Sequence, residues 1–225
     1  MERRGRWVRL MRLVMLPGRR ESELRGRPRV RDRRVMTPDA AQSTVQVRHL
    51  QPAEWAEVRE VRLGALAESP GAFFATLEQE QAYDEQKWRQ RLTETAYFGA
   101  WEDGRLIGLV ACFPEAGTDA GTDAGTDADQ DGAPAAGWHL VAMWVSPDRR
   151  GRGIADRLVE AVCDLARARG GTRVALWVAD ANPRAQAFYR RLGFRLSGER
   201  ALLRDDNPDS GEARMTLDLS GRPGT

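Results

Sequence analysis

The amino-acid sequence predicts an α/β domain with a mixed, mostly antiparallel sheet of six to seven strands, flanked by about four helices. Three observations favour this class. In some segments every second residue is apolar, which is typical of strands, and in others the apolar residues recur every three or four positions, which is typical of helices. The two kinds of segment are interspersed along the chain. Two apolar segments joined by Asp103-Gly104 have the pattern of an antiparallel hairpin. A nearly continuous apolar segment, residues 138–147, is typical of a central strand, and an amphipathic helix follows it.

The composition is that of one folded protein. Of the 225 residues, 41% are hydrophobic and 30% are charged, which is enough for one sizeable core and excludes global disorder. The two cysteines, Cys112 and Cys163, exclude a disulfide scaffold and lack the spacing of a metal site, so we expect buried free thiols and no bound metal. No stretch approaches the roughly 20 apolar residues that a bilayer span needs. We therefore expect a soluble, cytoplasmic protein that does not bind membranes.

The first segment of the chain is strongly basic. Residues 1 to 36 contain thirteen arginines against four acidic residues. Three interpretations stay open: a disordered arm that binds nucleic acid or another acidic surface, a transit-like amphipathic segment, or upstream sequence ahead of a true start at Met36. We favour the third, because the residues after Met36 have the pattern of a short leader into a first strand, so nucleic-acid binding is not expected.

A second segment of unusual composition lies inside the domain. Residues 115–137 contain Ala-Gly-Thr-Asp three times and predict a solvated acidic loop, since the glycine bend and terminal glutamate of a calcium loop are absent. The folded domain is therefore expected over residues 45–219, with 1–44 as a basic extension and 220–225 as a tail.

The first half of the domain is predicted as a strand, two helices and a hairpin. Alternation over residues 45–50 indicates a short strand. Pro52 opens a helix that ends before Pro70, and a weaker helical pattern covers about 77–92. The hairpin strands are residues 96–102 and 105–113. The inner face of the first helix is predicted to hold Trp55, Val58, Val61 or Arg62, Ala65 and Leu66.

The second half is predicted to alternate between strands and helices. The helix over residues 148–169 ends at Gly170-Gly171, and a strand follows over 172–180. Asn182-Pro183 then caps a short helix that ends at Gly193. A strand begins at Phe194, and residues 214–219 close the sheet. The inner stripes of the two helices are Ile154, Leu158, Ala161, Val162 and Leu165 in the first, and Ala185, Phe188, Tyr189 and Leu192 in the second.

The segment that carries chemical information is Arg149-Arg150-Gly151-Arg152-Gly153-Ile154-Ala155, between the central strand and the helix that follows. Glycines allow a phosphate to approach the backbone, and a helix N-terminus offers unpaired N–H donors, although tight packing turns also use such glycines. A nucleotide P-loop is excluded, because it needs a lysine and the only lysine of the chain is Lys87. A dinucleotide-binding loop is excluded because position 156 is Asp and not Gly.

Two motifs in register resemble those of one known family. Arg150-x-x-Gly153-x-Ala155 is similar to the Arg/Gln-x-x-Gly-x-Gly/Ala motif of the GNAT (Gcn5-related) N-acetyltransferases. Asn182-x-x-Ala185-x-x-Phe188-Tyr189-x-x-x-Gly193-Phe194 resembles the second motif of that family, and one helix and one strand separate the two. The resemblance covers residues 45–219 and implies the GNAT acyl-CoA N-acyltransferase fold, with direct acetyl transfer from acetyl-CoA, as cosubstrate, to an amine.

The resemblance also implies roles for particular residues. The backbone of the strand before the loop would bind the pantetheine arm, and Asn182 would contact the cofactor from its helix cap. Tyr189 would be the general acid, because a phenol with a pKa of about 10 can share its proton with a leaving thiolate whose conjugate acid has a pKa of about 8.5; the alternative is a core aromatic. The pyrophosphate would lie on the amides of Arg150, Gly151, Arg152, Gly153, Ile154 and Ala155, and the pantetheine arm on Met143, Trp144 and Val145.

The general base is less clear from the residues. His139 on the central strand is our first choice, since a protonated amine must lose a proton before it attacks. The family more often places an acidic residue there, and a histidine on an apolar strand is commonly a core side chain. Trp144 and Trp177, on neighbouring strands, either pack in the core or line the acceptor cleft.

Three interpretations of the function stay open. We expect an amine of a small molecule, with a protein or peptide amine as the first alternative and a non-catalytic acetyl-CoA-binding regulator as the second, and we allow for a homodimer. The excess of arginine over lysine, 34 to 1, is typical of a GC-rich genome and suggests a bacterial source.

Overall fold

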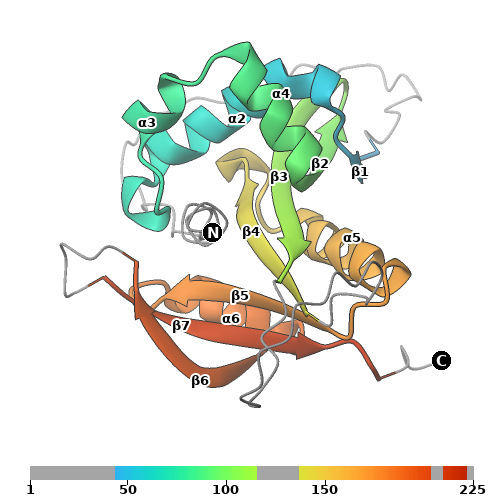
Figure 1. The fold of residues 1–225 in the computed structure, drawn as a ribbon, viewed down its shortest axis with the longest axis vertical. Coiled ribbons are helices and arrows are strands. Elements are labelled where there is room, and N and C mark those ends of the chain that lie inside the picture. Colours follow the sequence, from blue (N-terminus) through green and yellow to red (C-terminus); the bar gives the residue numbers. More distant parts are fainter. Residues whose placement is uncertain (1–43, 116–136, 204–209, 222–225) are drawn as a thin grey trace, which may run out of the picture.

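The computed structural model describes residues 44–115, 137–203 and 210–221, and the order of elements predicted from the sequence is confirmed there, except that one predicted helix is replaced by two (Figure 1). One seven-stranded sheet has the order β1-β2-β3-β4-β5-β7-β6 in these residues. Its strands are β1 (Gln46–His49), β2 (Ala96–Glu102), β3 (Arg105–Pro114), β4 (Gly137–Val145), β5 (Arg173–Ala179), β6 (Arg195–Leu202) and β7 (Gly211–Asp218). The helices are α2 (Trp55–Glu68), α3 (Leu77–Gln81), α4 (Glu85–Glu94), α5 (Ile154–Ala168) and α6 (Pro183–Arg191), with single 3₁₀ turns at Pro52–Glu54, Pro70–Ala72 and Pro147–Arg149.

The Asp103-Gly104 hairpin forms as predicted. Both turn residues have positive φ, 50° for Asp103 and 74° for Gly104, and Glu102 pairs with Arg105 across the turn. Positive φ at both central residues defines the type I′ turn, whose twist matches that of the strands that it joins. The turn thereby sets the register of β2 on β3.

The prediction of one helix over about 77–92 is wrong, because the chain forms two helices there. Asp84 accepts a hydrogen bond from the backbone N–H of Lys87 at 2.8 Å and caps α4, so the helical path is broken between α3 and α4. Thr76 caps α3 in the same way, through the N–H of Gln79. Hydrophobic periodicity alone does not distinguish one helix from two short consecutive helices.

The buried face of α2 includes Arg62 and not Val61. The Arg62 side chain is 2% exposed and forms a bidentate ion pair with Glu80 of α3, at 2.9 and 3.0 Å. Arg91 of α4 contacts the same carboxylate at 3.0 Å and donates to the hydroxyl of Tyr97 on β2 at 2.7 Å. Burial raises the pKa of Glu80, but the two guanidinium groups outweigh it and lower that pKa. The ion pairs therefore hold α2, α3 and α4 together as one unit.

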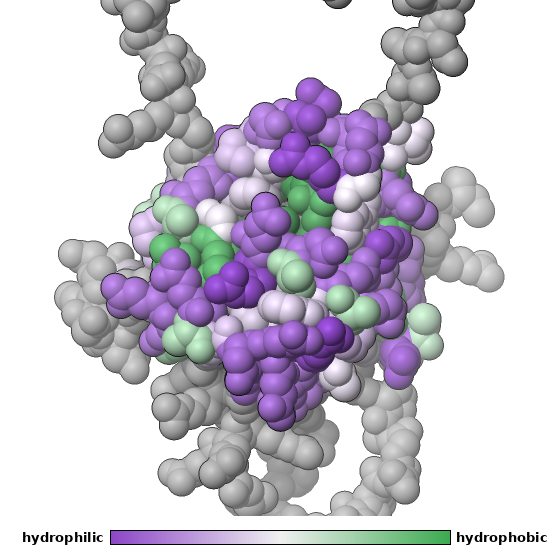
Figure 2. Space-filling model, turned by 90° about the horizontal axis from the view of Figure 1, so that it is seen from above, coloured by the Kyte–Doolittle hydropathy of each residue, from purple (hydrophilic) through white to green (hydrophobic). Residues whose placement is uncertain are grey.

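The sheet separates two layers of helices. Helix α5 packs on β3 and β4, and α6 lies behind β5 and β7, while α2, α3 and α4 gather at the other end of the molecule over β2 and β3 (Figure 1). The face over these three helices is mostly hydrophilic, with apolar side chains in small separate patches (Figure 2). Among the described helices, none has the length and apolarity of a bilayer span.

Strands β4 and β5 pair only at their beginnings. The parallel ladder joins residues 137–139 to 173–175 and then ends, although β4 continues to Val145 and β5 to Ala179. A β-bulge also interrupts the pairing of β3 with β4, where Ala142 has a φ of 54°. The centre of the sheet therefore opens between two parallel strands, and backbone groups of β4 beyond residue 139 are not used by β5.

Candidate active site

A pocket of about 390 Å³ lies at the carboxyl end of β4, between the segment 149–156, which includes the first residues of α5, and α6. Four arginines and one aspartate contribute to its lining, so the pocket attracts anions. It lies at the N-terminus of α5, a 15-residue helix whose partial positive charge favours the same ligands. The lining residues are Val145, Arg149, Arg150, Gly151, Gly153, Ile154, Ala155, Asp156, Arg184, Phe188 and Arg191.

The two glycines of this loop have left-handed backbone conformations. Gly151 has a φ of +79° and Gly153, the N-cap of α5, a φ of +74°. A Cβ atom added to either would meet no protein atom within 4 Å, so it would project into open space. Glycine is needed here both for the backbone path and to keep the N–H groups at the helix start accessible to a ligand.

Glu68, the last residue of α2, ties the loop to β4. Arg150 donates through Nε to the carbonyl of Val145 at 2.9 Å, and its Nη2 bonds both carboxylate oxygens of Glu68 at 3.0 and 2.9 Å. The indole Nε1 of Trp144 donates to the same carboxylate at 2.7 Å. The Glu68 carboxylate therefore fixes the first motif residue and the strand before it in one arrangement.

Helix α6 places two polar groups of the second motif in buried positions. The side-chain oxygen of Asn182 caps the helix by accepting from the N–H of Ala185 at 2.9 Å, while its Nδ2 is buried with no protein hydrogen-bond partner in the described part of the chain. Tyr189 is 0% exposed, and within the same described residues its hydroxyl also has no partner. Phe188 and Phe194 pack against its ring at 5.0 and 5.4 Å. Burial raises the pKa of Tyr189, so the phenol stays protonated.

Comparison with known proteins agrees with this geometry. The sequence model of the Acetyltransferase (GNAT) family matches residues 63–194, more than half of the chain. The chain belongs to the GNAT family of acetyltransferases.

Individual proteins are also similar to this chain. An uncharacterized N-acetyltransferase of Methanocaldococcus jannaschii is 33% identical over 108 residues, which are 48% of this chain and 42% of that protein, so the chain spans less than half of this curated relative. A Salmonella typhimurium protein solved with its cofactor acetyl-CoA has a TM-score of 0.60 at 16% identity, over 81% of this chain and 98% of the other. The PaiA N-acetyltransferase of Thermoplasma acidophilum, solved with coenzyme A, has a TM-score of 0.55 at 16% identity, over 78% and 99%. At these identities, the two structures show a shared fold.

The predicted site residues of this GNAT chain lie in several places. Of the predicted cofactor residues, Arg152 is exposed and does not line the pocket. Met143 and Trp144 lie beside the opening between β4 and β5, Asn182 caps α6, and Tyr189 lies on that helix. In the pocket itself are Val145, Arg150, Gly151, Gly153, Ile154 and Ala155.

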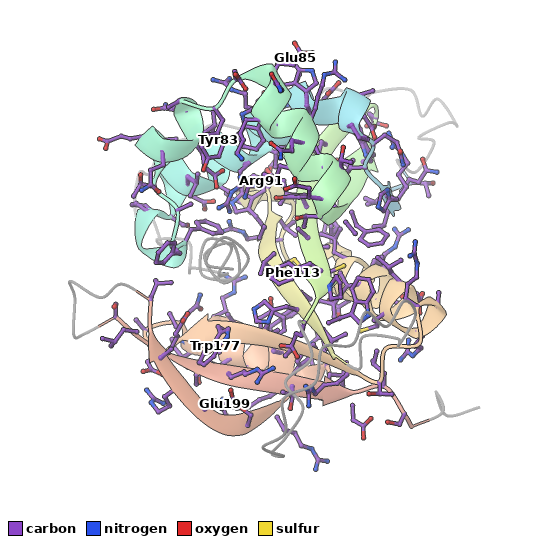
Figure 3. All side chains as sticks on the ribbon, viewed as in Figure 1. Tyr83, Glu85, Arg91, Phe113, Trp177 and Glu199 are labelled. Atoms are coloured by element: carbon purple, nitrogen blue, oxygen red, sulfur yellow. The ribbon has the colours of Figure 1, made fainter. Side chains whose placement is uncertain are left out.

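His139 lies on the opposite face of the sheet from Tyr189. Phe113, Ala175 and Trp177 share its face, because His139 pairs with Phe113 and Ala175, and Trp177 is two residues further along β5. Tyr189 instead packs in the cluster that contains the alternate residues of the same strands. In Figure 3, Phe113, Trp177 and Glu199 follow one another across the sheet from β3 through β5 to β6. The two residues predicted to exchange protons therefore lie on opposite faces of the sheet.

The remaining predicted residues are placed clearly. Cys112 and Cys163 are buried and free, and burial raises their pKa values to about 12 and about 11. Trp144 and Trp177 are half-buried, in agreement with either core packing or a place at the edge of a cleft.

Sequence reasoning missed two carboxylates near the site, Glu68 and Glu115. Glu115 was assigned to a solvated loop, but its N–H donates to the carbonyl of Gly137 at 2.8 Å, which extends the β3–β4 pairing by one step. The sequence offered one signal for these carboxylates, the position of Glu68 at the end of a predicted helix. The repeats of residues 116–136 and the basic segment 1–43 lie outside the described residues.

Proposed function

We propose that this GNAT protein transfers the acetyl group of acetyl-CoA directly to the amine of a small molecule. One observation carries the proposal: a loop with two left-handed glycines and an arginine-rich pocket at a helix N-terminus lies where the pairing of β4 with β5 has ended. A fold neighbour solved with acetyl-CoA supports the choice of donor. We propose residues 45–219 as the catalytic domain, with 1–44 and 220–225 as its appendages and with an inserted segment between Glu115 and Gly137, which themselves belong to the β3–β4 pairing.

The residues present suit the donor. Amides of the 150–155 loop and the positive end of α5 would hold the pyrophosphate, and the backbone of Met143, Trp144 and Val145 would bind the pantetheine arm where the β5 ladder is missing. The buried Nδ2 of Asn182 and the hydroxyl of Tyr189 lack protein partners in the described residues, and a bound ligand would provide them.

In the proposed reaction, the amine nitrogen forms a bond to the thioester carbonyl carbon while the bond from that carbon to sulfur breaks. Tyr189 donates its hydroxyl proton to the departing thiolate. His139 takes a proton from the acceptor ammonium. The electron pair left on the neutral amine nitrogen then attacks the thioester carbonyl carbon. Of the two protons that the ammonium loses, one ends on the thiol, after passing through Tyr189, and the other leaves to solvent through His139. General acid and base catalysis of this kind contributes about 10²–10⁴-fold for each group.

The test measures thiol release from acetyl-CoA by the full chain, with pooled polyamines, aminoglycosides, amino acids and short peptides. Gly153→Ala is compared with Gly198→Ala, since both residues have left-handed φ, +74° and +90°, and both face open space. Both variants place an alanine at positive φ, but only the Gly153 methyl group would block the loop. We expect release from a small-amine pool that Gly153→Ala lowers at least tenfold and Gly198→Ala does not.

Two results contradict the proposal. Release with the peptide pool alone means that the acceptor is a protein amine. No release from any pool, in a protein that binds acetyl-CoA, means that the chain binds the donor without transferring it.

A further inference from the structure

Glu115 lies at a junction of four strands in the described chain. Its carboxylate Oε1 is 3.3 Å from Nδ1 of His139 on β4 and 2.5 Å from Nη2 of Arg214 on β7. Its Oε2 is 3.3 Å from Nη2 of Arg173 on β5. The backbone N–H of Glu115 pairs with Gly137, so the sheet itself sets the position of this residue at the end of β3.

The carboxylate of Glu115 is ionised at neutral pH. Burial raises its pKa, but the hydrogen bond from His139 and the positive charge of Arg214 outweigh that effect and lower the pKa to about 2. An ionised carboxylate accepts hydrogen bonds and donates none. The Nδ1 of His139 must therefore be the donor, and in the neutral imidazole this tautomer has its lone pair on Nε2.

We propose that Glu115 is a positioning residue that holds His139 in the tautomer able to take a proton at Nε2 and balances the two arginines beside it. The proposal rests on the proposed function only for the role of His139 as the base. In that step an N–H bond of the acceptor ammonium breaks, the electron pair stays on the amine nitrogen, and the proton binds Nε2.

The charged groups around His139 show why a carboxylate is needed. Arg173 and Arg214 approach from β5 and β7, and both disfavour a positive imidazole. Glu199 of β6 binds the far side of Arg214 at 2.7 and 2.9 Å, and Glu212 lies two residues before Arg214 on the same face of β7. From β3 the ring of Phe113 lies 5.4 Å from the His139 ring and contributes no charge. The His139 side chain is 3% exposed, so solvent screens these charges weakly.

The tautomer can be measured without any substrate. The chain has two histidines, His49 and His139, so an imidazole nitrogen spectrum of the ¹⁵N-labelled full-length protein contains two ring systems, and His49→Gln assigns them. We expect the Nδ1–H tautomer at His139. In Glu115→Gln we expect the midpoint of the His139 titration to move down by about 1–3 pH units, because an opposite charge at this distance is removed.

Two variants control for a general disturbance of the site. Glu199→Gln removes a carboxylate from the same arginine without touching the imidazole, so the His139 midpoint should change by less than a third of the Glu115→Gln shift. Glu115→Asp keeps the charge and should restore the tautomer and most of the midpoint. In kinetics, Glu115→Gln should lower kcat/KM for the amine about 10²–10⁴-fold and move the acidic limb of its pH profile in the same direction as the His139 midpoint.

The outcomes separate this proposal from the proposed function. If the His139 tautomer and midpoint are the same in Glu115→Gln as in the parent, Glu115 is not a positioning residue, whatever the activity. If both change while His139→Gln keeps full thiol release, Glu115 does position the imidazole, and the base of the proposed function is another group.

Discussion

Replacing Tyr189 by Phe should raise the stability of the free protein and abolish most of its activity. The hydroxyl is buried and has no hydrogen-bond partner in the described chain, and removal of an unsatisfied buried polar group is worth about 1–3 kcal/mol. For a protein of this size, 1 kcal/mol corresponds to about 2–4 °C in Tm, so we expect a rise of about 2–12 °C. Loss of the general acid should lower kcat about 10²–10⁴-fold.

Tyr97→Phe is the matched control. Tyr97 is also 0% exposed, but its hydroxyl accepts a hydrogen bond from the Arg91 guanidinium at 2.7 Å. Its removal should cost about 1.5–3 kcal/mol and leave thiol release per folded molecule unchanged. Differential scanning calorimetry and the thiol assay, run on the same samples, measure both quantities. A lower Tm in Tyr189→Phe means that its hydroxyl has a partner, and unchanged release means that it is not the acid.

Three further predictions concern groups that the sheet and helices bury. Glu80→Gln leaves two buried guanidinium groups without their carboxylate and should cost about 3–5 kcal/mol in urea unfolding, whereas Glu85→Gln, in an exposed pair, should cost about 0.3–0.5 kcal/mol; equal costs contradict the first value. Cys112 and Cys163 should not react with a disulfide reagent at pH 8 until the protein unfolds, and reaction within minutes in the native state would show that burial does not protect them. The lowered pKa of Glu115 means that its contribution to stability is complete above pH about 4.5 and is lost as pH falls toward 2, so the urea midpoint should fall less steeply over that range in Glu115→Gln than in the parent.

Much of the fold could be predicted from local patterns, because each element carries its own signal. Sequence neighbours alone determine the Asp103-Gly104 turn, the helix cap at Asn182, and the hydrophobic periodicities of strands and helices. The cofactor loop was predicted for the same reason, since its glycines and the helix that follows are contiguous. The split between α3 and α4 was missed because the capping aspartate, Asp84, lies inside a continuous polar helical pattern.

The network around His139 could not be predicted in this way. Glu115, Arg173 and Arg214 are separated from one another by more than 40 residues in sequence. Only the strand order and register bring the two arginines to the Glu115 carboxylate. Each alone has the pattern of an exposed charge at a strand end or on a polar strand face. The burial of Arg62 has a similar origin, because its partner Glu80 belongs to a different helix.

Two groups of the proposed chemistry, on Asn182 and Tyr189, are among the buried polar groups that have no hydrogen-bond partner in the described residues. The buried charge of Glu80 is paired with two arginines, whereas the hydroxyl of Tyr189 and the amide of Asn182 have no protein partner in the described residues, and β4 continues where its β5 ladder stops. Each unmet polar group costs folding free energy, so the sheet and the helix layers must offset that cost. A ligand that supplies the missing partners would recover part of this free energy on binding. Binding of the donor should therefore stabilise the parent protein more than Tyr189→Phe, in which one of these requirements is already removed.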